Sequence, residues 1–347
     1  MTKNPLAPPG TDPTPIFEAF RGNYGSELLT AAVAHLDVFS RLAAGPRTAA
    51  DLADELGLAA RPAVVLFTAL RAMQLLATDA QGRLALTPLA REHLLPDHEF
   101  DVSGYIGAAA DSAGVLAMVE RLRTNGVAQS EDGAAYMYRE GERSAMDQEA
   151  SARHLTLALA GRAKNVAPVL AERISLADAR LLVDIGGGSG MYAIACLRRW
   201  PRLRAIVWDR AEVLKVAQEL GEQYQVSDRL ECRPGDMLAD PLPAGVDCAL
   251  LSNVLHDWDV HDCRQLVARC AAALPSGGRL LIHDVYLNDQ HDGPLAVALY
   301  SAALFAVTEG RAYSAAEYRE WLLAAGLDPQ PIVPTLIHCG VLEGRKP

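Results

Sequence analysis

The feature that most constrains the fold is a regular alternation of short apolar segments with longer helical patterns after residue 178. Short segments that are rich in branched apolar residues are typical of buried strands. Five of them lie at residues 180–185, 204–209, 229–237, 246–255 and 278–287, and helical patterns lie at residues 191–200, 211–224 and 262–274. This alternation predicts an α/β architecture, in which helices cover both faces of a Rossmann-like parallel sheet.

The first half of the chain lacks this alternation and is mostly helical in pattern. Apolar residues recur at helical spacing over residues 15–44, and Thr48 with Asp51 forms a capping pair for a short helix. A second helix begins near Pro62, and residues 75–87 predict a small hairpin. Helix, turn, helix and hairpin is the pattern of a winged helix, which is compatible with a DNA-binding module or with a packing and dimerisation module.

The charge of the chain argues against nucleic acid as a partner. The sequence has 43 acidic and 32 basic residues and a formal net charge of −11, and such a surface repels a phosphate backbone. The second helix of the winged-helix pattern offers only Arg61 and Arg71 as bases. No segment approaches the roughly 20 apolar residues that cross a membrane, and residues 1–15 read as a tail without the apolar core of a signal peptide. We therefore expect a cytoplasmic protein that binds neither nucleic acid nor membrane.

A glycine-rich loop, GGGSG, follows the first predicted strand at residues 186–190 and comes shortly after Asp184. In open parallel sheets, ligands bind beyond the carboxyl ends of the strands, and glycines such as Gly186 and Gly188 let the backbone approach a ligand closely. A nicotinamide fingerprint needs glycine at the sixth position of GxGxxG, and this position is Met191. The loop therefore favours a cofactor without a pyrophosphate, and a nicotinamide oxidoreductase is the weaker alternative.

Two more acidic residues follow the next two strands. Asp209 ends the second strand, where a carboxylate can bind ribose hydroxyls, and Asp236 with Met237 follows the third, where the pair can bracket an adenine ring. Together with Asp184 they make three acids after three successive strands, without a phosphate-binding lysine. Such a set suits a positively charged nucleoside that lacks phosphate, and S-adenosylmethionine is such a molecule.

The stretches VDIGGGSG, IVWD, GDM and VLHDWD occur in this order. The set resembles the class I S-adenosylmethionine-dependent methyltransferases, and more narrowly the small-molecule O-methyltransferases of the plant caffeate and acetylserotonin type with their bacterial secondary-metabolite relatives. The resemblance covers nearly the whole chain. It implies a seven-stranded catalytic sheet over residues 166–347, a winged-helix dimerisation and substrate-lid domain over residues 1–165, and a homodimer.

The resemblance assigns His256, at the end of the fourth strand, as the general base that removes the proton of a phenol. A histidine has a pKa near 6.5 and can accept this proton at neutral pH. Two carboxylates flank this histidine in the family. Asp284 occupies one of the two places, but Ala312 stands where the second acid is expected, and Glu309 is a shifted alternative. The substrate is then a hydroxylated aromatic small molecule, with O-methylation favoured and C-methylation of the ring ortho to the hydroxyl as the alternative.

The remaining predicted site residues are less specific. Ser252 stands four positions before the histidine, where the family often has a basic residue that touches the cofactor. Candidates for contact with the substrate are His154, Arg162, Tyr300 and Phe305. An arginine in the pocket would favour a substrate that carries a carboxylate. We expect no metal site. Of the four His-Asp pairs, the one at 261–262 falls in a helix that leads away from the strand end and the one at 291–292 lies in a polar loop, so only His256 and the pair at 283–284 are expected to converge.

Overall fold

The computed structural model describes residues 7–96, 98–126 and 144–347. The chain divides into two compact units. The first unit takes residues 1–15, 129–286 and 315–347, and the second takes residues 16–128 and 287–314. Among the described residues, no helix combines the length and the apolar character needed to cross a bilayer.

This division differs from the predicted boundary between residues 165 and 166. That boundary falls inside α9 (Glu149–Arg173), a continuous helix that belongs wholly to the first unit. The second unit also includes α13 (Leu295–Val307), although this helix lies in the C-terminal half of the sequence, because it packs on helices of the N-terminal half. Its sequence, LAVALYSAALFAV, is apolar on nearly all sides, so it can pack against either unit, and its periodicity does not indicate which one.

The first unit contains a mixed sheet whose strands run in the order β10-β11-β7-β6-β3-β4-β5. The strands of this unit are β3 (Leu181–Ile185), β4 (Arg204–Asp209), β5 (Leu230–Pro234), β6 (Cys248–Ser252), β7 (Arg279–Leu287), β9 (Asp328–Pro329), β10 (Val333–Pro334) and β11 (Cys339–Arg345). Strands β3 to β7 pair in parallel, and β11 runs antiparallel to β7. All five predicted strands are present. The resemblance implies a sheet of seven strands, and the short strand β9, which pairs with β11, is additional to the seven strands in the order above.

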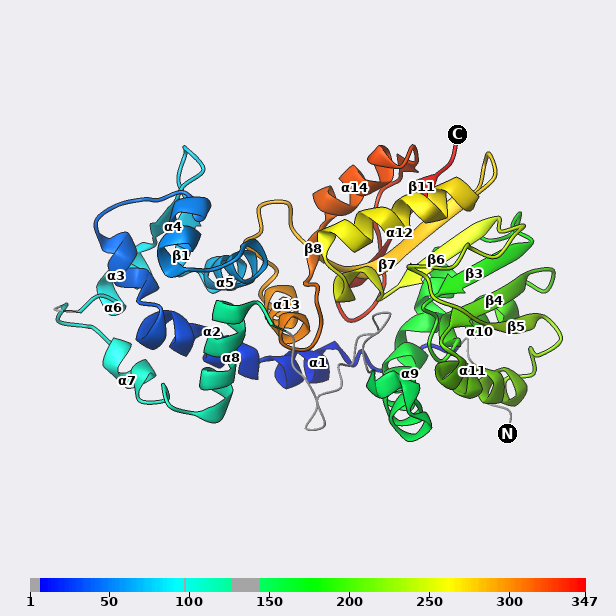
Figure 1. The fold of residues 1–347 in the computed structure, drawn as a ribbon, viewed down its shortest axis with the longest axis horizontal. Helices are drawn as coiled ribbons and strands as arrows, with labels where there is room; N and C mark the ends of the chain where they lie inside the picture. Colours follow the sequence, from blue (N-terminus) through cyan, green and yellow to red (C-terminus); the bar gives the residue numbers. More distant parts are fainter. Residues whose placement is uncertain (1–6, 97, 127–143) are drawn as a thin grey trace. The chain divides into compact units, whose positions relative to one another are not determined.

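Helices cover both faces of this sheet. The helical elements of the first unit are η2 (Ala145–Asp147), α9, α10 (Met191–Arg199), α11 (Ala211–Gln223), η3 (Leu255–Asp257), α12 (Val260–Ala273) and α14 (Ala315–Ala324). Helices α9, α10 and α11 pack together on one face, and α12 packs with α14 on the other (Figure 1). The β3–α10–β4 and β6–α12–β7 crossovers bring the carboxyl ends of β3, β4, β5 and β6 to one edge of the sheet.

The second unit is mainly helical. It contains most of α1 (Thr14–Arg21), α2 (Asn23–Thr30), η1 (Ala31–His35), α3 (Val38–Ala43), α4 (Ala49–Leu56), α5 (Ala60–Ala72), β1 (Leu76–Thr78), β2 (Leu84–Leu86), α6 (Pro88–His93), α7 (Ser103–Gly107), α8 (Ala113–Thr124), α13 and β8 (Tyr313–Ser314). The predicted order of helix, helix and hairpin is present as α4, α5 and the antiparallel pair β1–β2. The predicted cap is confirmed, because Thr48 Oγ1 accepts the Asp51 N–H at 3.0 Å.

The core of the second unit joins residues that are far apart in the sequence. Leu28, Leu66 and Phe305 are wholly buried in one apolar cluster. Full burial of one such side chain contributes roughly 1.5–3 kcal/mol. The cluster therefore explains why α13 belongs with the N-terminal helices.

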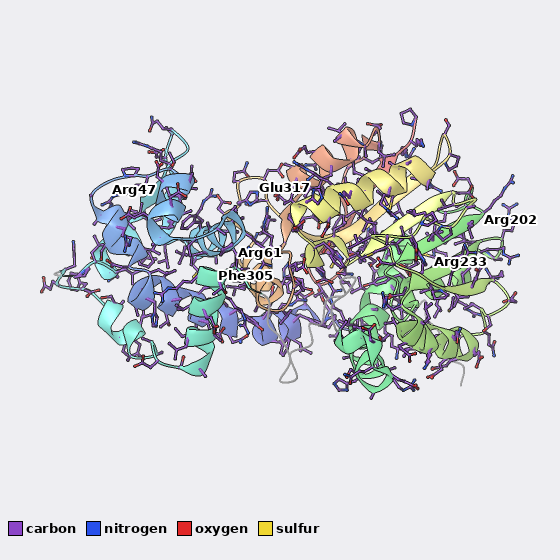
Figure 2. All side chains as sticks on the ribbon, in the orientation of Figure 1. Arg47, Arg61, Arg202, Arg233, Phe305 and Glu317 are labelled. Carbon is purple, nitrogen blue, oxygen red and sulfur yellow. The ribbon has the colours of Figure 1, made fainter. Side chains whose placement is uncertain are left out.

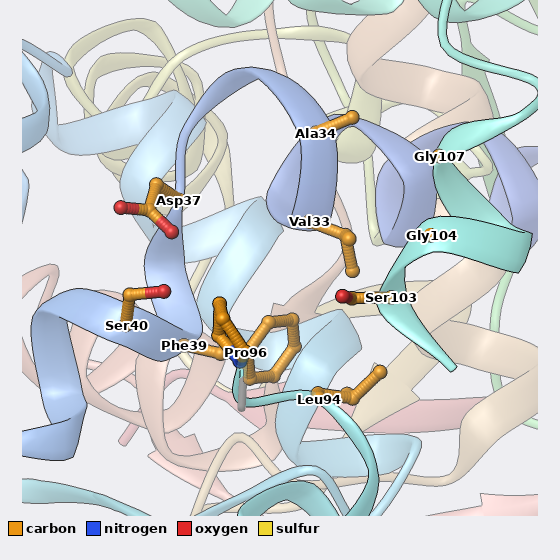
Figure 3. A pocket seen from close by; sticks show the side chains of 10 residues that line it. All are labelled: Val33, Ala34, Asp37, Phe39, Ser40, Leu94, Pro96, Ser103, Gly104 and Gly107. Atoms are coloured by element: carbon orange, nitrogen blue, oxygen red, sulfur yellow. The ribbon is translucent and has the colours of Figure 1, made fainter. Parts of the chain in front are cut away.

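The second unit also contains a cavity of about 250 Å³. Its lining is formed by Val33, Ala34, Asp37, Phe39, Ser40, Leu94, Pro96, Ser103, Gly104 and Gly107 (Figure 3). None of the predicted site residues lines this cavity.

Candidate active site

The loop after β3 forms one wall of the candidate site. Gly186 and Gly188 have φ values of 61° and 57°, a left-handed conformation that glycine adopts at little cost. The Gly186 N–H donates to the carbonyl of Trp208 at 2.9 Å, which fixes the loop to the end of β4. A Cβ atom on Gly187 would lie 2.8 Å from Cγ of Asp184. The backbone therefore closes tightly over the Asp184 carboxylate, and no larger residue fits at this point.

Asp184 is wholly buried, and its two carboxylate oxygens have no hydrogen-bond partner among the described residues. Burial raises its pKa to about 7, and the nearby charge of Asp209 acts in the same direction. The Ala193 amide offsets the effect only in part and does not reach hydrogen-bond geometry. A buried carboxylate without a donor is costly. Asp184 is therefore suited to a ligand that brings a positive charge or N–H and O–H donors.

Asp209 connects the loop after β3 with the loop after β4. Its Oδ2 accepts the Gly188 N–H at 2.8 Å, and its Oδ1 accepts the Arg210 N–H at 2.7 Å. The side chain is half-buried. Burial raises its pKa, while the two backbone donors lower it. Each oxygen retains a lone pair for a ligand hydroxyl.

Asp236 and Met237 lie beside these residues, after β5. The Gly235 N–H donates to the Asp209 carbonyl at 3.1 Å, which brings this loop next to the end of β4. Asp236 Oδ1 accepts the Leu238 N–H at 2.8 Å. The Met237 sulfur lies 3.7 Å from the point where a Cβ on Gly186 would stand. The structure thus gathers the predicted acids, the glycine loop and Met237 at one edge of the sheet.

His256 lies just beyond β6, in η3, and pairs with Asp284 on the neighbouring strand β7. The His256 Nδ1 atom and Asp284 Oδ1 are 2.5 Å apart, and both side chains are buried. The other ring nitrogen, Nε2, lies 3.6 Å from Oδ1 of Asp257. The predicted histidine and its predicted carboxylate are therefore in direct contact.

The carboxylates around His256 control its protonation. Burial by itself lowers the pKa of His256, but the negative charges of Asp284 and Asp257 outweigh burial, so the pKa is raised above its ordinary value. Burial raises the pKa of Asp284, but the charge of His256 and the hydrogen bonds from His256, Val285 and Tyr318 lower it overall. Asp284 is therefore ionised at neutral pH and stabilises a protonated histidine.

Tyr318 is a member of the site that the sequence did not indicate. Its hydroxyl donates to Asp284 Oδ2 at 3.1 Å, and both side chains are wholly buried. The Val285 N–H donates to the other oxygen of Asp284 at 2.8 Å. Tyr318 lies on α14, 34 residues after Asp284, within an ordinary amphipathic pattern. Only the packing of α14 against the sheet shows its role.

Ser252 belongs to a buried polar network. Its hydroxyl lies 2.8 Å from Nδ1 of His283, and the Asn253 amide donates to the same oxygen at 3.1 Å. Burial lowers the pKa of His283 to about 3, so this histidine stays neutral. The Ser252 hydroxyl is thus engaged with protein groups, and its contact with a cofactor stays a prediction.

The predicted substrate residues lie in different surroundings. In the first unit, Arg162 donates to Asn253 Oδ1 and to the Cys339 sulfur, each at 2.9 Å. His154 also lies on α9, but its side chain is exposed. The contact with Asn253, three residues before His256, brings the arginine charge close enough to lower the pKa of His256.

The other two substrate candidates belong to the second unit. Tyr300 is half-buried and stacks against Arg21, whose guanidinium carbon is 3.5 Å from the ring centre. Phe305 is wholly buried in the core beneath Arg61, at 4.6 Å (Figure 2). The side chain of Phe305 thus has no accessible surface in this structure, and its contact with a substrate stays a prediction.

The described part of the chain holds no group of three or more His, Cys, Asp or Glu side chains that could bind a metal ion. The donor set at the glycine loop consists of carboxylates and backbone amides, which fits the nucleoside and the positive charges of S-adenosylmethionine.

Known proteins match this chain over its whole length. Residues 129–328 match the O-methyltransferase domain. The chain is 36% identical over 322 residues to the 3-hydroxy-5-methyl-1-naphthoate 3-O-methyltransferase of Streptomyces sahachiroi, covering 92% of this chain and 90% of that protein. It is 34% identical over 164 residues to the L-tyrosine C(3)-methyltransferase of Streptomyces lavendulae, covering 46% and 44% of the two chains.

Solved structures give the same result. The crystal structure of an O-methyltransferase family 2 protein from Planctomyces limnophilus, in complex with apigenin, is 48% identical, covers 100% of this chain and 99% of its own, and superimposes with a TM-score of 0.90. Other solved O-methyltransferases of this fold hold S-adenosylmethionine or S-adenosylhomocysteine. The chain therefore belongs to the O-methyltransferase family and is an S-adenosylmethionine-dependent methyltransferase.

Proposed function

We propose that this enzyme methylates a phenolic oxygen of an aromatic small molecule, with His256 as the general base. The observation that carries the proposal is the buried contact of His256 with Asp284 beside the glycine loop. Val254, two residues before the histidine, lies 3.1 Å from the point where a Cβ on Gly186 would stand. The base and the cofactor loop therefore share one edge of the sheet, as an in-line transfer between two bound molecules requires.

The residues around the loop would hold S-adenosylmethionine, which supplies an electrophilic methyl group on a sulfonium. Asp209 would bind the ribose hydroxyls, and Asp236 with Met237 would contact the adenine. Asp184 and the left-handed backbone at Gly186 and Gly188 would contact the remaining part of the cofactor. This assignment uses the carboxylate of Asp184, which is buried and has no partner among the described residues.

The protein's part in the reaction is to prepare the acceptor oxygen. A phenol has a pKa of about 10 and is mostly protonated at neutral pH. His256 Nε2 accepts the phenol proton while Nδ1–H donates to Asp284. Tyr318 and the Val285 amide fix the orientation of that carboxylate. The ionised Asp284 then stabilises the imidazolium that forms.

The substrate class follows from the relatives. One similar enzyme methylates a hydroxynaphthoate and another binds the flavone apigenin, and both molecules carry phenolic hydroxyls. We infer a hydroxylated aromatic metabolite of secondary or antibiotic biosynthesis as the substrate here. Arg162, near the base, would suit a substrate carboxylate, and His154 and Tyr300 remain proposed contacts.

C-methylation of the ring is the second candidate. It is favoured by the partial similarity to an L-tyrosine C(3)-methyltransferase. The same deprotonation supports both outcomes, because a phenolate is also nucleophilic at its ortho carbon. The position of the ring relative to the methyl group decides between them.

For the second unit we propose a winged-helix module that mediates homodimerisation in a cytoplasmic enzyme. A role in binding nucleic acid has little support, because the two bases of its second helix are engaged within the unit. Arg61 donates to the carbonyls of Thr308 and Gly310, and Arg71 lies 3.9 Å from Asp292. Light scattering should give twice the monomer mass of 37.2 kDa, and a monomer would contradict the dimer.

The test of the proposed function is incubation with methyl-labelled S-adenosylmethionine and a panel of phenols that includes apigenin and a hydroxynaphthoate. NMR of the products distinguishes a methoxyl carbon from an aryl methyl carbon. We expect methoxyl products. Aryl methyl products would establish the second candidate, and a protein that binds the cofactor without methylating any phenol would contradict both.

A further inference from the structure

His256 lies between two carboxylates, one at each ring nitrogen. Asp284 contacts Nδ1 at 2.5 Å, and Asp257, the next residue in η3, lies 3.6 Å from Nε2. The function proposed above uses only the first of these carboxylates. Asp257 thus faces the nitrogen that takes up the substrate proton.

The two carboxylates differ in their access to solvent. The side chains of His256 and Asp284 are 4% and 1% exposed, whereas that of Asp257 is 32% exposed. Both oxygens of Asp284 are also engaged, with His256 and the Val285 amide on one side and with Tyr318 on the other. Asp284 therefore offers a proton on Nε2 no exposed oxygen, whereas Asp257 lies 3.6 Å from Nε2 and has accessible surface.

We propose that Asp257 is the proton relay of the enzyme and carries the substrate proton from His256 to solvent in each turnover. This inference rests on the proposed function of His256. The phenol O–H bond breaks, and an N–H bond forms at Nε2. The oxygen electron pair forms the new bond to the methyl carbon, and the electrons of the broken carbon–sulfur bond stay on sulfur. The Nε2 proton then passes to Asp257 Oδ1 and on to water, which restores the neutral base.

The charges around this pair are consistent with the relay. Asp284 on β7 and Arg162 on α9 both act on His256, with opposite signs. Burial raises the pKa of Asp257 to about 6, His256 acts in the opposite direction, and Asp284 adds to the increase. An acid with this pKa can accept a proton from an imidazolium and release it near neutral pH.

Asp259 provides a matched control. It lies two residues after Asp257 and is exposed, and its Oδ1 accepts the Asp262 N–H at 3.0 Å as the N-cap of α12. Asparagine caps helices as well as aspartate does. Asp259→Asn therefore removes one acidic charge from the same segment without disturbing the base.

The experiment compares Asp257→Asn, Asp257→Glu and Asp259→Asn with the wild type in dilute buffer at neutral pH. The acceptor is the phenol of the panel that the wild type methylates fastest. We expect Asp257→Asn to lower kcat by about tenfold or more while the Kd for S-adenosylmethionine stays within about twofold. Rising concentrations of imidazole buffer should restore kcat in this variant only, because an external base replaces the relay. Asp257→Glu should retain most of the activity, and Asp259→Asn should match the wild type.

The proposal is overturned if Asp257→Asn keeps the wild-type kcat, or if its lost activity does not respond to buffer concentration. A measurement without substrate adds a second check. NMR titration of His256 should show a lower pKa in Asp257→Asn than in the wild type, and an unchanged pKa would contradict the contact. Failure of the proposed function looks different, since the wild type would then methylate no phenol or His256→Ala would remain active.

Discussion

The Nδ1 atom of His256 lies 2.5 Å from Oδ1 of Asp284, and neither side chain is more than 4% exposed. A histidine held in this way has one nitrogen committed to the carboxylate and one available for proton transfer. Because His256 lies just beyond β6 and Asp284 lies within the neighbouring parallel strand β7, the contact depends on the register of β6 with β7.

Replacement of the base should abolish turnover but leave the cofactor site intact. For His256→Ala we expect kcat to fall by about 100-fold or more, because general-base catalysis is lost. The Kd for S-adenosylmethionine should change by no more than about threefold, a difference below 1 kcal/mol. Calorimetry and steady-state kinetics measure the two quantities. A variant that keeps wild-type activity would end the base assignment.

The pH dependence of activity should report the raised pKa of His256. The base works only when neutral, so kcat/KM should rise with pH, with a midpoint above 6.5. In Asp284→Asn the carboxylate that favours the protonated ring is gone, so the midpoint should move to lower pH. A pH profile of both proteins, recorded with one phenol, checks the sign. A midpoint that moves to higher pH in Asp284→Asn would contradict the electrostatic role of Asp284.

Tyr318 should act through Asp284 rather than on the substrate. Tyr318→Phe removes the hydrogen bond to a buried carboxylate, which is worth about 1.5–3 kcal/mol. We expect a kcat lower by about tenfold, an unchanged Kd for S-adenosylmethionine and a small shift of the pH profile. Kinetics over a pH series distinguishes this from general destabilisation. An equally large loss of affinity for S-adenosylmethionine would instead indicate damage to the whole edge of the sheet.

Asp209 should affect the binding of the cofactor more than the methyl-transfer step. Asp209→Ala removes a ligand for ribose hydroxyls and frees the Gly188 amide that positions the loop. Loss of hydrogen bonds to a charged group predicts a Kd for S-adenosylmethionine that is weaker by about tenfold or more. Asp228→Ala, at an exposed side chain, is the control. Calorimetry that gives the same affinity for both variants would refute the ribose role.

The full burial of Phe305 predicts a stability defect when its side chain is truncated. Phe305→Ala empties a wholly buried site in the second unit and should lower the free energy of unfolding by about 3–5 kcal/mol. Val307→Ala, on the same helix but 39% exposed, should have little effect. Denaturant unfolding measures both. A stable Phe305→Ala protein with an altered substrate preference would instead support contact of Phe305 with the substrate.

Local patterns were sufficient for the elements and for much of the site. The strands between residues 180 and 287, the Thr48 cap and the carboxylates that follow β3, β4 and β5 could be predicted, because residue periodicity and strand-end positions are local properties. His256 and Asp284 could be paired through the resemblance to the O-methyltransferases, in which a carboxylate flanks this histidine. The full burial of Phe305 could not be predicted in this way, because an apolar helix such as α13 has no pattern that separates core from pocket.

What the sequence by itself determined is the α/β class, the site at the carboxyl edge of the sheet and the chemical types of its groups. Only the tertiary structure decided that α13 joins the N-terminal helices, that Tyr318 supports Asp284, and that Asp257 rather than Asp284 reaches solvent. These features depend on contacts between residues far apart in the chain and on the burial of each side chain. Both arise when the elements pack, and no local spacing records them.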